Sequence, residues 1–178
     1  MLLETTIFLK PFVHIAQYAR VMNAYFPIIS RLIEYELWCN FQALSLLEKL
    51  SAEEYRRDFG FGLRTPHHTM FHIANVMRTW SLQVAPVIQN STPLVYDPNS
   101  SLQEIRALFE DVGAAWVLAA RDSDAIGLLE QDRRLHQVFH LVTHGTHHRG
   151  QLLSMATILG YEQPFEGGDF GGWSNMGR

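Results

Sequence analysis

One stretch of the chain decides its fold and its candidate site: His140-Leu-Val-Thr-His144-Gly-Thr-His147-His148-Arg149-Gly150-Gln151. It holds four histidines within nine residues, inside a segment whose pattern is otherwise that of a helix. His144 and His148 are four residues apart, so on a helix they lie one above the other on the same face. Two imidazoles placed in this way can reach one metal ion. A third ligand from another helix would complete a site with an open position.

This stretch lies in the last of four long segments with helical patterning. We expect that helix to run over about Asp132–Leu159, because Gly160 and Pro164 are typical of the residues that follow a helix end. Another helix is expected over about Pro66–Gln83. Its start is clear, since Thr65 is a good N-cap and proline is well suited to the first helical position.

Two more helices complete the set. Apolar residues recur at three- and four-residue steps over about Ile28–Leu50, and Ser51-Ala-Glu-Glu54 follows as a short capped turn. The capping box Ser101-Leu-Gln-Glu104 starts a helix that continues to about Ala120. The intervening stretch Ala85–Asn99 contains three prolines and is expected to be a loop.

Four amphipathic helices without a convincing strand predict an all-α fold, a four-helix bundle. We expect a single domain over residues 1–178, with its core at about 24–164. An extra N-terminal segment, with a candidate helix at 7–25, precedes the core, and an irregular Gly-rich tail follows it at 165–178. A partly irregular connection, with a short strand or turn at 126–129, joins the last two helices.

Composition narrows the functional classes. The 178 residues are 47% hydrophobic and 18% charged, which suits a domain with a sizeable core. The net charge is −4 and no Lys/Arg run occurs, so we expect no nucleic-acid partner. No stretch is long and apolar enough to cross a bilayer and no signal-peptide pattern occurs, so we expect a cytoplasmic protein without a membrane partner. Cys39, the single cysteine, fits a reducing compartment.

Helix geometry decides which of the clustered histidines can share an ion. At about 100° per residue, His148 falls about 40° from His144, on the apolar stripe of the helix. His140 and His136 drift to the other side, and the ladder from His136 to His148 spans about 18 Å, which is too long for one ion. His144 with His148 is therefore the preferred pair, and His140 with His144 the second choice. His147 lies on the flank, where it can bond a ligand or contact substrate.

Three neighbouring polar side chains have separate expectations. Gln151 falls about 20° from His144, where it can hydrogen-bond the metal ligands. Arg149 falls about 140° from His144 and points away from the core, so we expect it in a surface or inter-helix salt bridge. Cys39 is expected to be a buried small hydrophobe rather than a nucleophile.

The third ligand is expected on the helix that begins at Pro66. His72 shares an apolar stripe with Val76 and Trp80, about two turns in from the capped start. His68 is one turn nearer the solvent end and is the fallback ligand, whereas His67 points elsewhere.

A single histidine on an apolar face is more often a hydrogen-bonded core residue than a ligand. Two imidazoles on one inner stripe are different, because burying both costs free energy unless they are paired or coordinated. We therefore favour a metal over purely structural histidines. Three neutral imidazoles suit zinc, nickel, cobalt or ferrous iron, with zinc and nickel preferred. Three protein ligands leave one position for water or substrate, which is typical of catalytic sites.

Three motifs resemble the DinB-like family of metal-binding four-helix bundles. They are Tyr35-Glu-Leu-Trp38-Cys-Asn40, then His72 followed by Trp80, and then His144-Gly-Thr-His147-His148-Arg149-Gly150-Gln151. Their order and spacing place the resemblance over about Ala24–Pro164. The resemblance implies metal ligands at His72, His144 and His148, the set that helix geometry also favours.

The wider superfamily includes thiol-dependent transferases and isomerases that use bacillithiol or mycothiol. The resemblance therefore implies a metal-dependent enzyme of the thiol-dependent S-transferase type, or a related hydrolase or isomerase, with a small-molecule substrate and a low-molecular-weight thiol as a further cofactor. The alternative is a non-catalytic metal-binding stress-response protein, and a third possibility is a bundle without metal. Bundles of this family often associate through helix faces, which implies a homodimer.

Two regions depart from the family pattern. Residues 1–21 precede its usual start, so Met22 is a candidate initiator and the extra segment a candidate dimer interface. The Gly-rich tail either covers the mouth of the site, with Asp169, Phe170 or Trp173 near the metal, or is a disordered end.

Overall fold

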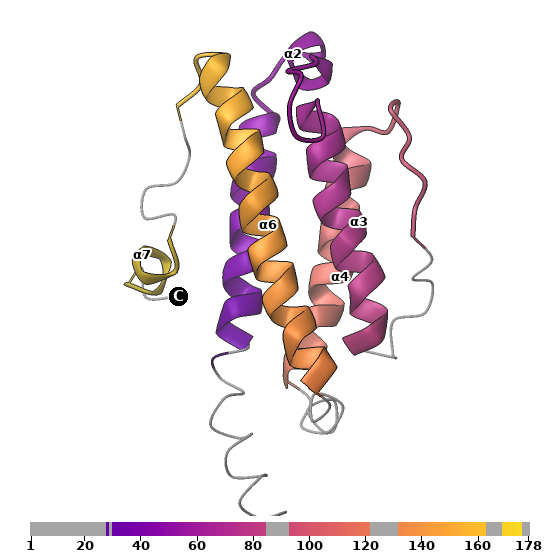
Figure 1. Cartoon of the computed structure of the whole chain (residues 1–178), viewed down its shortest axis with the longest axis vertical. Helices are drawn as coiled ribbons and strands as arrows, with labels where there is room; N and C mark the ends of the chain where they lie inside the picture. Colours follow the sequence, from indigo (N-terminus) through magenta and orange to yellow (C-terminus); the bar gives the residue numbers. More distant parts are fainter. Residues whose placement is uncertain (1–27, 29, 85–92, 122–131, 163–168, 176–178) are drawn as a thin grey trace, which may run out of the picture.

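The protein is described here by a computed structural model, which covers residues 28, 30–84, 93–121, 132–162 and 169–175. Within these ranges the chain is all-α and contains no strand, and four long helices pack side by side as a bundle (Figure 1). The helices are an unlabelled first helix at residues 30–47, α2 at Ala52–Arg56, α3 at Pro66–Val84, α4 at Leu102–Arg121, α6 at Asp132–Ile158 and α7 at Phe170–Asn175. The predicted four-helix bundle is confirmed.

Local capping residues start and end these helices where the sequence indicates. Thr65 Oγ1 accepts the backbone N–H of His68 at 3.0 Å at the start of α3. Ser51 and Glu54 form a full capping box, and the segment expected to be a short capped turn is the short helix α2. Gly160 follows α6 with a φ of +88°, a conformation that glycine adopts without strain.

Apolar side chains from all four long helices fill the interior of the bundle. The largest fully buried ones are Leu44, Leu46, Leu47, Met70, Ile73, Ile105, Phe109, Trp116, Val138, Leu152 and Met155. The Trp116 indole N–H donates to the Met77 carbonyl at 3.4 Å, which satisfies its one polar group inside the core. Helix α3 packs against both α4 and α6, so one of its faces is directed at the histidine-rich helix.

The glycine-rich tail contains a short helix, α7, and the expectation that it is irregular is wrong for residues 170–175. Trp173 is only 3% exposed and packs against Tyr35 and Cys39 of the 30–47 helix, and the Arg31 guanidinium lies 4.3 Å from its ring centre. The composition of the tail does not indicate this helix, because a single buried tryptophan anchors a segment that is otherwise rich in glycine. The described contacts of α7 are with the 30–47 helix, so they do not support the alternative that placed it over the histidines.

Several expectations fall outside the described residues. They concern the segment 1–21, the candidate helix at 7–25 and the strand or turn at 126–129. Residues 93–101 lie in a loop between α3 and α4, as the prolines predict for this region. None of the helices in the described ranges combines the length and apolarity needed to cross a membrane.

Candidate metal centre

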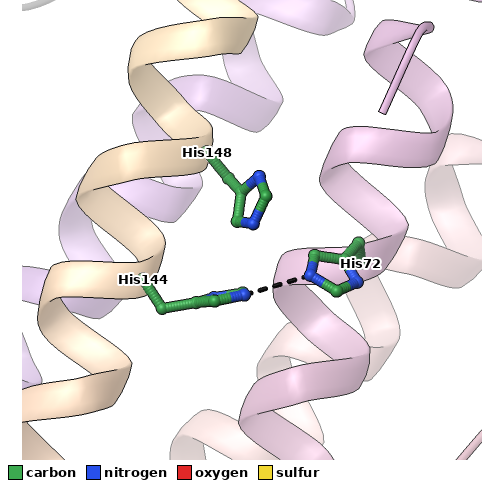
Figure 2. Close-up of side chains that lie close together, drawn as sticks. All are labelled: His72, His144 and His148. Atoms are coloured by element: carbon green, nitrogen blue, oxygen red, sulfur yellow. Dashed lines mark hydrogen bonds between the residues drawn. The ribbon is translucent and has the colours of Figure 1, made fainter. Parts of the chain in front are cut away.

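Three histidine side chains from two helices meet between α3 and α6 (Figure 2). His72 comes from α3, and His144 and His148 come from adjacent turns of α6. The Nε2 atoms of His72 and His144 are 3.0 Å apart. One nitrogen of each of the three rings lies within 4.8 Å of the others, so the structure brings together the three residues proposed from the sequence.

The spacing of these nitrogens fits a metal ion. A tetrahedral ion with bonds of about 2.0–2.1 Å holds its ligand atoms about 3.3 Å apart. The His72–His144 distance is already near this value, and the His148 ring centroid lies 4.7 Å from that of His72 and 4.4 Å from that of His144. The cluster is partly buried, with all three residues of intermediate exposure. The three side chains could therefore hold one ion between them.

Electrostatics keep these imidazoles uncharged. Burial, together with the neighbouring imidazoles of His148 and His72, lowers the pKa of His144 to about 3. Burial also lowers the pKa of His72 and of His148. A neutral imidazole has the free lone pair that metal coordination requires, so the site does not have to lose protons at neutral pH before it binds an ion.

Gln151 holds the ring of His148. Its Oε1 lies 3.0 Å from His148 Nδ1, and its Nε2 lies 3.0 Å from His147 Nε2. Because an amide oxygen only accepts, His148 carries its proton on Nδ1 and has a lone pair on Nε2. Among the described residues, that Nε2 atom has no hydrogen-bond partner. Gln151 thus lies beside His148 and His147, as its position on the helix predicts.

The other histidines considered from the sequence do not belong to the cluster. His140 is exposed and packs on Trp80, with ring centroids 4.7 Å apart. His68, the fallback ligand, stacks on Tyr96, with ring centroids 4.0 Å apart. His67 is fully buried, and its two ring nitrogens bond Tyr96 and Ser100.

Comparison with known protein families identifies a match for this chain. The family model described as "DinB family" matches residues 22–169, which is most of the chain. This chain belongs to the DinB family. Searches of curated proteins and of solved structures found no significant match. The match starts at Met22, includes all three clustered histidines and covers the stretch of about Ala24–Pro164 over which the three motifs resemble the family.

In this DinB-family chain, Arg149 is buried, and the expectation that it points away from the core is wrong. Its guanidinium makes two hydrogen bonds to the Glu36 carboxylate, at 2.5 and 2.8 Å, and a third to Asn40 Oδ1 at 2.7 Å. The inter-helix salt bridge that was also expected for Arg149 is present, and its partner is Glu36. On a helical wheel of α6, the direction away from α3 points towards the 30–47 helix, because a helix in a bundle has more than one neighbour.

Glu36 was not recognised from the sequence, although a signal was available. Glu36 and Asn40 are polar, four residues apart and on a helix that is otherwise largely buried. Although burial opposes the charge of Arg149, the carboxylate beside it raises the pKa of that guanidinium, so the group stays charged. The pair connects the helix carrying two of the histidines to the 30–47 helix.

Proposed function

We propose that the protein binds one divalent ion, zinc or nickel, through the Nε2 atoms of His72, His144 and His148, and acts as a thiol-dependent transferase on a small electrophile. The observation that carries this proposal is the convergence of three neutral imidazoles, one held in the required tautomer by Gln151. A metal bound there would supply Lewis acidity, lowering the pKa of a thiol or water at the position the protein leaves open.

The chain's own residues divide the remaining work. His144 and His148 are held on adjacent turns of one helix, which keeps their spacing constant. His140 and His147, both exposed, lie next to this pair on its two sides, with ring centroids 5.3 Å from His144 and 4.9 Å from His148. We propose these two as the groups that contact the thiol or the substrate.

One observation favours the alternative of a non-catalytic metal-binding protein. The cluster joins α3 to α6, so an ion bound to it connects two helices of the bundle and stabilises the fold whether or not a reaction occurs. Binding to the native state alone contributes about 2.7 kcal/mol when the free ion is at a hundred times its dissociation constant. Both functions therefore predict the same site and differ only in turnover.

Metal analysis of protein purified without metal-affinity chromatography tests the site. We expect one ion per chain in the wild type and a large loss in His144→Ala, with a lower melting temperature. His136→Ala is the matched control, since His136 is an exposed histidine on the same helix, and it should keep the ion.

The outcomes separate three functions. A metal-loaded protein that conjugates bacillithiol or mycothiol to epoxides or activated halides supports the transferase. Stoichiometric metal without turnover of these thiols supports the non-catalytic protein. Absence of a stoichiometric ion, with His144→Ala as stable as the wild type, would overturn the metal site itself.

A further inference from the structure

A loop distant in sequence touches the amide that orients His148. Gly62, in the loop between α2 and α3, lies so close to Gln151 that a β-carbon built on it would be 2.7 Å from Oε1 and 2.8 Å from Cδ. A methyl group on residue 62 would therefore require the Gln151 amide to move. The backbone of Gly62 also has a φ of +55°, which favours glycine in its own right.

The loop is held in place by bonds of its own. The Asp58 carboxylate accepts the Gly60 N–H at 2.8 Å and forms an ion pair with Arg64. The backbone of Phe59 donates to the Arg64 carbonyl at 2.8 Å, which closes the loop around Gly62. The loop therefore presents a fixed surface to Gln151.

The Gln151 amide has little freedom to move away from that surface. Its oxygen accepts from His148 and its nitrogen donates to His147, so both ends are engaged. A rotation of the amide by half a turn would exchange the oxygen and the nitrogen. His148 Nδ1 would then face a donor, and the ring would have to carry its proton on Nε2, where it blocks coordination.

We propose that the 58–64 loop is a positioning element of the metal centre, which packs Gly62 against Gln151 and so holds His148 in the tautomer with a free Nε2. The inference rests on the proposed metal site, and it adds a segment outside α3 and α6 to that site. Groups that orient a metal-bound histidine typically contribute about 10- to 100-fold to metal affinity.

Two glycines of the loop provide a matched experiment. Gly62→Ala adds a methyl group against Gln151, whereas Gly60→Ala adds one with nothing within 4 Å. Both residues have positive φ, at +55° and +77°, so both variants carry a similar backbone cost. By competition with a chromophoric chelator, we expect Zn²⁺ to bind about tenfold more weakly to Gly62→Ala, and within about twofold of wild type to Gly60→Ala.

A second readout does not depend on metal. Long-range ¹H–¹⁵N correlation spectra of the zinc-free protein report which nitrogen of His148 carries the proton. We expect the Nδ1–H form in the wild type, in Gly60→Ala and in Gln151→Glu, whose carboxylate still accepts from Nδ1. We expect a mixture of the two tautomers in Gly62→Ala. We also expect it in Gln151→Leu, a substitution that removes the amide but leaves the loop unchanged.

The two readouts fail separately. If the wild type binds no zinc, the proposed function fails, but the spectra still decide whether the loop sets the tautomer. An identical His148 tautomer in the wild type, Gly62→Ala and Gln151→Leu would overturn the inference. So would equal zinc affinity of the two alanine variants.

Discussion

Gly145, one turn before Arg149 on α6, lies against the buried Glu36–Arg149 pair. A β-carbon at this position would overlap Glu36 Oε1 and lie 2.7 Å from Arg149 Nη1. Glycine is otherwise unfavourable inside a helix, by about 1 kcal/mol relative to alanine. The glycine therefore allows a charged carboxylate to approach the helix backbone, and the two ion-paired side chains depend on it.

This contact predicts a loss of stability in Gly145→Ala despite the better helix propensity of alanine. Removing or displacing one partner of a buried ion pair typically costs about 3–5 kcal/mol, so we expect a net loss of about 2 kcal/mol or more by urea unfolding. Gly150→Ala is the matched control on the same helix, because nothing lies within 4 Å of its added carbon. It should gain up to about 1 kcal/mol. Equal stability of the two variants would contradict this account of Gly145.

At the scale of elements, the 30–47 helix is held by contacts on two sides. Arg149 of α6 binds its Glu36 and Asn40, and Trp173 of α7 covers its Tyr35 and Cys39. Burial raises the pKa of the Cys39 thiol, and Cys39 is only 2% exposed. Its reactivity is therefore a sensitive measure of whether α7 stays in place.

Trp173→Ala should release α7 from the bundle. A helix of six residues is not stable without its tertiary contact, so we expect its amides to lose protection from hydrogen exchange. We also expect Cys39 to react with a thiol reagent about tenfold faster, which corresponds to about 1.4 kcal/mol of local stability. Phe170→Ala, at a residue 37% exposed on the same helix, should have a smaller effect. Unchanged labelling of Cys39 in Trp173→Ala would show that α7 does not protect it.

At the scale of the whole molecule, buried histidines couple stability to pH. Burial lowers the pKa of His67 and of the three clustered histidines relative to the unfolded value of 6.5, that of His144 to about 3. Above pH 6.5 neither state binds these protons, and the stability is fully present. As the pH falls below 6.5, the unfolded chain takes up protons that the native state refuses, so the free energy of unfolding decreases, and for His144 this continues to about pH 3.

We therefore expect the zinc-free protein, kept in a chelator, to lose stability between pH 7 and pH 5. Each such histidine contributes at most about 1.4 kcal/mol per pH unit, and less where solvent screens it. Urea unfolding at several pH values should show a shallower pH dependence in His144→Gln than in the wild type. The exposed His136 serves as the control, and His136→Gln should keep the wild-type slope. Equal slopes in all three proteins would mean that His144 is not kept neutral by the fold.

Much of the fold and of the candidate site could be predicted from the sequence by itself. The starts of α3 and α4 and the pairing of His144 with His148 depend on residues within a few positions of one another, because capping and the 3.6-residue period act over that range. The same period predicts four amphipathic helices, which bury their apolar faces by packing together as a bundle. The choice of His72 over His68 followed from its apolar stripe, and the structure places His72 in the cluster and His68 on Tyr96.

Only the tertiary structure decided the contacts between distant segments. Arg149 meets Glu36 across 113 positions, Trp173 anchors a glycine-rich tail, and Gly62 packs against Gln151. A helical wheel assigns each side chain an angle but does not say which neighbouring helix occupies that direction, so it placed Arg149 outside the core. These partners are set by how the helices pack, and the local sequence pattern does not say which helices become neighbours.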